Sequence, residues 1–370
     1  MIKIKLLLIT CFISAFLDGM AFEIPKFSGY LQAGYGYNSV GEGTSTFMIK
    51  KFRISMNAPI VDKAYIFAQV ELFNGLNTGG RWENQKTIQV IDAYGAYKFS
   101  DALQVRVGQF NSPAGYENYL VNPANNQTID YAPICTRMVC RNAIGYDYVD
   151  FGRDLGIMAL GSLFKSSTED FHHLTYNVAI TNGHLPSVND NNKSKDIMAA
   201  LTFYPIKKFN VKLSYTWGEY TPDTFSGNLD NETYPWNQVQ GNKYLPLNRV
   251  IVGAWYNDPD GLVVRSEYGH LSSSHSGIQL VKEDAFYLLA AYNIGKWCPV
   301  VRFDTYRDKI NKTLPDNRER GLIGFNFQLI NHLKIQANYL LSHYTSLAAD
   351  ATNSGHRYSS EVLIMGLFIF

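Results

Sequence analysis

Segments in which apolar and polar residues alternate dominate this chain, and they constrain its fold more than any other feature. In Leu333–Leu341 every second residue is apolar, and the first three residues between them are Lys, Gln and Asn. The same alternation runs through 51–60, 103–107 and 321–329. Because successive side chains of a strand point to opposite faces, the pattern predicts strands with one apolar and one polar face. About sixteen such segments of roughly ten residues follow one another without a convincing helical period, so the expected fold class is all-β.

The end of the chain indicates what surrounds the apolar faces. Residues 358–370 form one strand-like segment, and counting back in twos from Phe370 gives a continuous non-polar face. The opposite face is also mostly apolar, so this segment needs an apolar environment on its outer side. Lipid provides that environment to the strands of a membrane barrel. We therefore predict a single transmembrane antiparallel β-barrel of about sixteen strands, with a secreted Tyr-rich β-sandwich as the alternative.

Connections between the predicted strands alternate between short and long. Short ones are expected near 61–63, 100–101, 205–209, 258–261, 295–298 and 331–332. Longer ones are expected near 40–46, 75–86, 111–153, 182–195, 221–247, 273–283, 308–318 and 345–357. Short periplasmic turns and long outer loops are typical of membrane barrels, and an even strand number returns the C-terminus to the periplasmic side. A barrel of this size has room for an aqueous channel, so residues 22–370 are interpreted as one domain.

The first 21 residues have the pattern of an export signal. Lys3 and Lys5 precede an apolar stretch, 6–17, and the segment ends in small residues at 19–21. The stretch is too short for a membrane-spanning helix, so residues 1–21 are predicted to be a cleaved signal peptide. Cys11 would suit lipoprotein processing, but apolar sequence continues past it. Export and a barrel fold together predict the outer membrane of a Gram-negative bacterium.

Charge and motifs exclude several classes of function. Removing Lys3, Lys5 and Asp18 from 33 basic and 32 acidic residues leaves 31 of each, so there is no basic excess for nucleic acid. No G-x-S-x-G, H-E-x-x-H or G-x-x-x-x-G-K motif is present, so the chain is not expected to be an enzyme. No metal and no cofactor is expected either, since one C-x4-C pair without other clustered ligands is a poor zinc signature.

The long connection 111–153 is the expected constriction of the channel. Its many apolar and aromatic side chains need a surface to pack against, and the barrel lumen offers one. Its charges are Arg137, Arg141 and Arg153 against Glu117, Asp130, Asp147 and Asp150. Two interpretations stay open, a loop held by internal ion pairs and a loop that selects solutes by charge. Cys135 and Cys140 are a candidate disulfide in the oxidising periplasm, with two unpaired thiols as the alternative.

Alternation also predicts which charged side chains point into the lumen. The basic ones are Lys51, Arg53, Lys98, Arg106, Lys212, Arg265, Arg302 and Lys334, and the acidic ones are Glu71, Asp92, Glu267 and Asp304. Each either stabilises the wall through a cross-strand ion pair or contributes to the field that a solute meets. The residues expected to form the anion path are Lys51, Arg53, Arg106, Arg137, Arg141, Arg153, Arg265 and Arg302.

Several stretches resemble the phosphate-selective porin O and P family of outer-membrane channels. They are the segments 91–110, 113–118 (PAGYEN) and 152–157 (GRDLGI), together with the basic strand 51–55. The resemblance is best over residues 28–160, and the order and spacing of its motifs make it specific. It implies a sixteen-stranded barrel, a homotrimer, conduction of small anions and a third loop folded into the pore. A near-zero mature charge departs from the expectation for a strongly phosphate-selective pore, so the resemblance predicts a porin better than it predicts phosphate.

The expected function is that of a porin for passive diffusion of small hydrophilic solutes, with a modest preference for anions and phosphate as a candidate. The alternatives are a non-selective general porin and a surface adhesin or structural barrel that binds a partner through outer loops such as 221–247. Resemblance to such barrels further implies that the terminal Phe370 belongs to the pattern read by the barrel-assembly machinery. The expected partners are therefore small anions, outer-membrane lipid, that machinery and further copies of the chain.

Overall fold

The computed structural model describes residues 24–40, 43–78, 81–85, 88–139, 152–184, 186, 189–221, 239, 242, 244–310, 317–345 and 357–370. The predicted signal peptide lies outside the described residues, as do Cys140 and Arg141. The first strands are β1 Lys26–Asn38, β2 Thr44–Val61, β3 Ala64–Thr78, β4 Arg81–Gln85, β5 Gln89–Ser100, β6 Leu103–Asn111, β7 Arg153–Lys165 and β8 His172–Thr181. The others are β9 Asp196–Ile206, β10 Phe209–Tyr220, β11 Leu245–Asn257, β12 Leu262–His275, β13 Ile278–Tyr292, β14 Trp297–Asp308, β15 Arg318–Ile330, β16 Leu333–Tyr344 and β17 Tyr358–Ile369.

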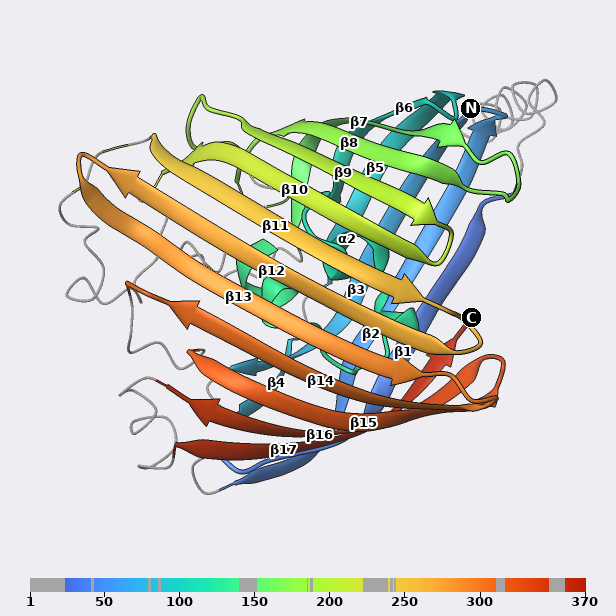
Figure 1. The fold of residues 1–370 in the computed structure, drawn as a ribbon, viewed down its shortest axis with the longest axis vertical. Helices are drawn as coiled ribbons and strands as arrows, with labels where there is room; N and C mark the ends of the chain where they lie inside the picture. Colours follow the sequence, from blue (N-terminus) through green and yellow to red (C-terminus); the bar gives the residue numbers. More distant parts are fainter. Residues whose placement is uncertain are drawn as a thin grey trace, which may run out of the picture.

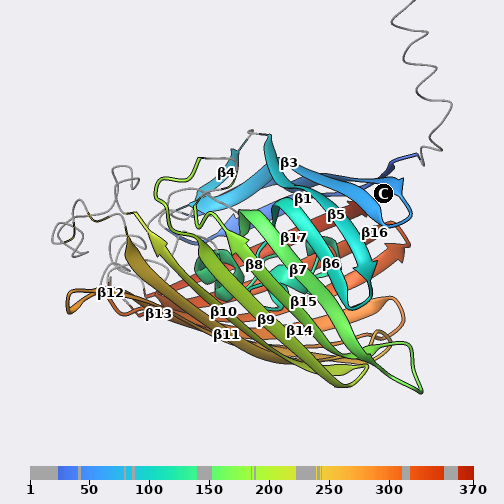
Figure 2. The same cartoon turned by 90° about the horizontal axis from the view of Figure 1, so that it is seen from above.

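The strands form one closed antiparallel barrel. Each strand pairs with its neighbour in the chain, and β17 returns to β1 with Tyr30 opposite Ile369 and Asn38 opposite Glu361. The strand β4 pairs only with the end of β3, so sixteen of the 17 described strands make up the wall. Figure 1 shows these strands inclined side by side, and Figure 2 shows the wall curving around its interior. The predicted barrel is confirmed, and the β-sandwich alternative is wrong.

The connections at one end of the barrel are short, as predicted, but one of these and one connection at the opposite end differ from expectation. The segment 166–171 joins β7 to β8 and was not predicted as a turn. The expected long loop 273–283 is instead a tight hairpin, because β12 and β13 continue until His275 pairs with Ile278. Its two turn residues, Ser276 and Gly277, have φ of 50° and 82°, the conformation that matches the twist of the flanking strands. The serine-rich composition of this hairpin suggested a loop, although the strands remain paired.

Burial in the wall is the reverse of that in a water-soluble protein. Large apolar side chains are exposed on the outer face, among them Val107 and Ile157 at 55% and Ile323 at 60%. On the inner face Glu267 is 2% exposed and Asp304 is fully buried. Along β11 every buried residue is followed by an intermediate or exposed one. An apolar outer surface around a polar interior fits a barrel that faces lipid. Among the described residues no helix is long and apolar enough to cross a membrane.

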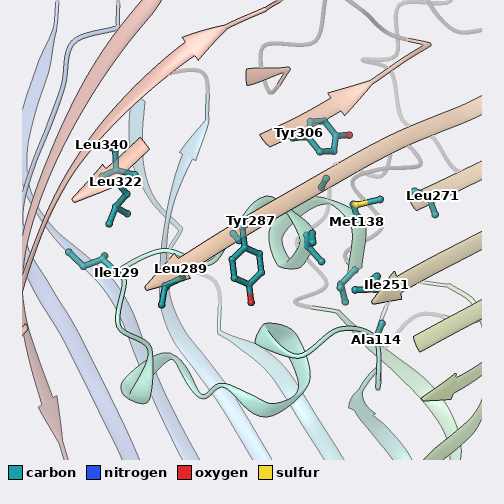
Figure 3. Packing of buried hydrophobic residues seen from close by; sticks show 14 of the residues in the cluster. Ala114, Ile129, Met138, Ile251, Leu271, Tyr287, Leu289, Tyr306, Leu322 and Leu340 are labelled. Carbon is teal, nitrogen blue, oxygen red and sulfur yellow. The ribbon is translucent and has the colours of Figure 1, made fainter. Parts of the chain in front are cut away.

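The chain between β6 and β7 folds inward, and its described part, residues 112–139, is here called the inner loop. It contains a short helix α2 Glu117–Leu120, a 3-10 turn η1 Pro123–Asn125 and a π-helical turn η2 Ile134–Val139. Figures 1 and 2 show these turns inside the ring of strands. Figure 3 shows Ile129 and Met138 of the inner loop in the same apolar cluster as Ile251, Tyr287 and Leu289 of the wall. The inward position predicted for this connection is confirmed for its described part.

Candidate functional site

Glu267 of β12 holds the start of the inner loop against the wall. The backbone N–H groups of Tyr116 and Glu117 donate to its two carboxylate oxygens, at 2.5 and 3.1 Å, and the Tyr287 hydroxyl donates at 2.8 Å. The side chain of Glu267 lies on the inner face because it alternates with the outward Tyr268. A carboxylate that accepts three hydrogen bonds away from water is a strong anchor, since each donor would be costly to leave unpaired.

Two predicted pore arginines bind the middle of the inner loop. The Arg265 guanidinium donates to the Asn126 Oδ1 at 3.2 Å and also to the side-chain carbonyl of Gln127. The Arg302 guanidinium donates to the Thr128 hydroxyl at 2.9 Å and to the backbone carbonyl of Asp130 at 2.7 Å. Both arginines are 2% exposed. The donors of both guanidinium groups therefore position the inner loop. A passing solute would have to compete with the loop acceptors for these donors.

A β-bulge places two consecutive lysines inside the barrel. Gln32 pairs with Lys51 while Ala33 pairs with Ile49, so Lys50 is the extra residue. Lys50 and Lys51 are 4% and 8% exposed, although strict alternation predicts that only one of them faces inward. Lys50 was for that reason not among the residues predicted to face inward. The available signal was the break in alternation itself, two lysines between an isoleucine and a phenylalanine.

The inward lysines change the electrostatics of Asp130 in the inner loop. The Lys50 Nζ lies 2.9 Å from the Asp130 Oδ1, and the Lys51 ammonium lies 4.9 Å from the ring centroid of Tyr131. Burial alone would raise the pKa of Asp130, but the two ammonium groups outweigh it and the pKa is lowered. Asp130 is therefore a stable anion at the junction between β2 and the inner loop.

Other predicted arginines form ion pairs within the wall. The Arg53 guanidinium lies 2.7 Å from Glu71, and the Arg153 guanidinium lies 3.2 Å from Asp92. Asp304 accepts from Arg302 at 2.9 Å and from Arg320 at 3.1 Å. All of these groups come from inner-face positions or the loop-side edge of the wall. Arg53, Glu71, Arg302, Asp304 and Asp92 are therefore the charges assigned to the lumen by alternation that lie in these pairs of opposite sign.

The end of the described inner loop is buried against the wall. The Arg137 guanidinium stands 5.4 Å from the ring centroid of Tyr306, and Met138 is fully buried. The Cys135 thiol is buried, and burial is the largest cause of its strongly raised pKa. Its predicted bond to Cys140 lies outside the described residues, as does the place of Arg141.

Glu117 is the most deeply placed carboxyl of the inner loop. It is 1% exposed and accepts the backbone N–H of Ala132 at 2.6 Å. Burial raises its pKa above the ordinary value, and the nearby guanidinium groups of Arg302 and Arg265 offset only part of that effect. The neighbouring Tyr116 ring stacks on Trp255 with 3.5 Å between centroids. The loop is thus fixed to the wall by both polar and aromatic contacts.

Arg106 of β6 has a different environment from the other predicted arginines. Its guanidinium stands 5.0 Å from the ring centroid of Tyr94. Within the part of the chain that the structure describes, no carboxylate lies within ion-pair distance of it. It is partly exposed, whereas Arg265 and Arg302 are buried under the inner loop.

The predicted basic residues Lys212, Lys334 and Lys98 bind the inner loop or the turn between β5 and β6. Lys212 and Lys334 donate to loop carbonyls, and Lys98 pairs with Asp101. Among the described residues no group of three His, Cys, Asp or Glu side chains could hold a metal ion.

The barrel resembles solved porin structures over nearly its whole length. OmpF of Salmonella typhi, solved with daunomycin, is 12% identical with a TM-score of 0.64, covering 94% of this chain and 97% of its own. An anion-selective porin from Comamonas acidovorans is 10% identical with a TM-score of 0.62, covering 94% and 99%. OmpT of Vibrio cholerae, in a trimer form, is 10% identical with a TM-score of 0.55, covering 94% and 99%.

These likenesses define the class of fold, a sixteen-stranded barrel of the porin type. At such low identities they establish the fold alone. No protein-family model matches the sequence, and no curated protein matches it.

Proposed function

We propose that the chain is an outer-membrane porin, a passive channel for small hydrophilic solutes with a modest preference for anions. The observation that carries this proposal is the closed barrel whose outer face is apolar and whose inner face is polar. Such a wall separates lipid from a polar interior, and the inner loop narrows that interior. A function that needs no moving part and no cofactor suits this architecture.

The proposed anion path runs along the inward basic residues. It comprises Lys51, Arg53, Arg106, Arg137, Arg141, Arg153, Arg265 and Arg302. Support comes from Lys51 and Arg106, which have no ion-pair partner among the described residues. The carboxyl groups of Glu117 and Glu267 also have no ion-pair partner among the described residues. Because these acidic groups oppose the basic ones, the proposed preference for anions is modest. Rings of basic side chains favour anions in proportion to their uncompensated charge.

The resemblance of residues 28–160 to the phosphate-selective porins supports phosphate as one solute of this channel. The near-zero charge of the mature chain argues for weak discrimination, and a general porin is the limiting case. The Comamonas structure that the barrel resembles is an anion-selective porin, which is consistent with the proposed preference.

The proposal includes the route to the membrane and the assembled state. Residues 1–21 would direct export, and the terminal Phe370 would be read by the barrel-assembly machinery. The mature barrel would form a homotrimer in the outer membrane of a Gram-negative bacterium. The Vibrio OmpT structure is described as a trimer, which supports this assembly by analogy of fold. A disulfide between Cys135 and Cys140 would close a small ring and stiffen the constriction.

Planar-bilayer recording of the purified full-length protein tests the channel function. In a potassium chloride gradient we expect stable conductance and a reversal potential displaced toward that of chloride. A reversal potential near zero would indicate the general porin. Protein that is folded by circular dichroism but neither conducts nor swells liposomes would contradict the channel function and favour the adhesin or structural barrel.

A further inference from the structure

The inner loop covers only one side of the lumen. Inner-face residues of β11–β17 are mostly buried beneath it, among them Val263, Leu289, Val300 and Gln336. On the opposite side, near the short turns, inner-face residues of β3 to β9 are partly exposed. They are Tyr65, Phe67, Tyr94, Gln104, Arg106, Leu160, Thr175 and Tyr204. Water therefore reaches the interior along this side.

Arg106 is the cation at the centre of this partly exposed surface. The Tyr94 ring lies beneath its guanidinium. Tyr65 packs on Tyr94, and Tyr119 lies against the same apolar cluster as Tyr94. The Tyr65 hydroxyl accepts from the Gln104 amide at 2.8 Å. Since no described residue accepts the Tyr65 proton, that hydroxyl can donate to a ligand. The planar guanidinium and this hydroxyl supply donors that suit a carboxylate.

Aromatic and apolar side chains surround these donors. Phe67 and Tyr65 pack on Tyr94, with ring centroids 5.4 and 6.3 Å away. Tyr94 and Leu160 rest in turn on a buried cluster that includes Phe110 and Met158. This surface offers planar faces to an apolar ligand body and few polar groups beyond Arg106.

We infer that Arg106, Tyr65, Tyr94 and Tyr119 form a binding site for an organic monoanion, a carboxylate carried on an aromatic body. The site rests on the proposed function, because it lies on the water-accessible side of the proposed channel. One guanidinium among aromatic rings matches a single negative charge, whereas a phosphate dianion needs further cations. Lys212, whose ammonium stands 4.6 Å from the ring centroid of Tyr119, is 2% exposed and donates to the Gly115 carbonyl, so it is not available to a solute.

The experiment records single-channel currents of the purified full-length protein in potassium chloride, with added benzoate, acetate or phosphate at matched ionic strength. Benzoate is expected to interrupt the current in a concentration-dependent manner, at lower concentration than acetate or phosphate. Arg106→Gln should raise the benzoate concentration for half-block by about tenfold or more, since a charge-assisted hydrogen bond is lost. Tyr94→Leu should weaken block by benzoate and leave the effect of acetate unchanged.

Lys98→Gln is the matched control. It removes one cation from the same side of the lumen, but Lys98 pairs with Asp101 at the turn, 2.7 Å away. Its half-block concentration should equal that of the wild type. Stronger block by phosphate than by benzoate in the wild-type protein would overturn the site. Normal chloride conductance without benzoate block would overturn it too and leave the channel function intact. A complete absence of conductance would overturn both.

Discussion

Lys50 and Asp130 form an ion pair, 2.9 Å between Nζ and Oδ1, that joins the bulge of β2 to the inner loop. The lysine side chain is 5% exposed and the aspartate side chain 27%. The lysine of the pair is therefore buried, and the aspartate is partly exposed. The Lys51 ammonium adds a second contact between β2 and the inner loop, 4.9 Å from the ring centroid of Tyr131.

Lys50→Met should lower the stability of the barrel by about 2 kcal/mol, because Asp130 loses its closest counter-charge inside the protein. Thermal unfolding in detergent, followed by circular dichroism, measures the change. Lys208→Met is the matched control, since Lys208 pairs with Asp258 at an exposed turn. In the double variant with Asp130→Leu most of the loss should be recovered. A double variant that shows the sum of the two single losses would contradict a direct interaction.

Glu267→Gln should loosen the inner loop without opening the barrel. In the wild type, the two carboxylate oxygens accept from the backbone N–H groups of Tyr116 and Glu117. The glutamine amide has only one acceptor oxygen, so its NH2 group would face one of these N–H donors. We expect larger fluctuations of the open-channel current, measured as current variance at constant voltage. Glu319→Gln, at an outward ion pair with Arg307, makes the same substitution away from the lumen and should leave the variance unchanged. Equal variance in all three proteins would show that Glu267 does not restrain the loop.

The outer face of the barrel was predictable because a single physical requirement acts on every strand. Lipid selects apolar side chains at alternate positions. Local patterns such as Leu333–Leu341 therefore predicted correctly which side chains of a strand face outward and which face inward. The closure of β17 on β1 followed from the same pattern, since an even strand count brings both termini to one side. These features depend on sequence neighbours within one strand.

The contacts of the inner loop were not predictable from the sequence in the same way. Lys50 was missing from the residues predicted to face inward because the bulge shifts the period by one residue, and alternation carries no rule for such a shift. The partners of Arg265, Asn126 and Gln127, lie about 140 residues away in the chain. No local pattern specifies that pairing. Alternation predicted both Arg53 and Arg106 to face the lumen, but only the structure shows that Arg53 pairs with Glu71 while no described carboxylate lies within ion-pair distance of Arg106.

The stability of the protein should depend on pH through Glu117. Burial raises its pKa from the ordinary 4.5, so the folded protein binds this proton more tightly than the unfolded chain. The stabilising contribution is present below pH 4.5 and is lost as the pH rises through the folded pKa. Glu117→Gln should therefore flatten the fall in unfolding temperature as the pH rises above 4.5, measured in detergent. A fall of equal size in both proteins would assign the pH dependence to other groups.

Removing Phe370 should impair assembly more than conduction. The backbone N–H and carbonyl of Phe370 exchange hydrogen bonds with Gly29 at 3.0 and 2.9 Å, which closes the last strand on the first. Its ring lies where a Cβ on Gly29 would be, 2.5 Å from the nearest ring carbon. Deletion of Phe370 removes both hydrogen bonds and the ring, whereas Phe370→Ala removes the ring alone.

Folded protein in the outer membrane, measured by quantitative blotting, should fall several-fold in both variants if the ring is the assembly signal. Single-channel conductance of the protein that does insert should stay at the wild-type value, because Phe370 lies on the outer face, away from the inner loop. A normal yield for Phe370→Ala with a reduced yield for the deletion would assign the effect to the strand closure instead of the aromatic side chain.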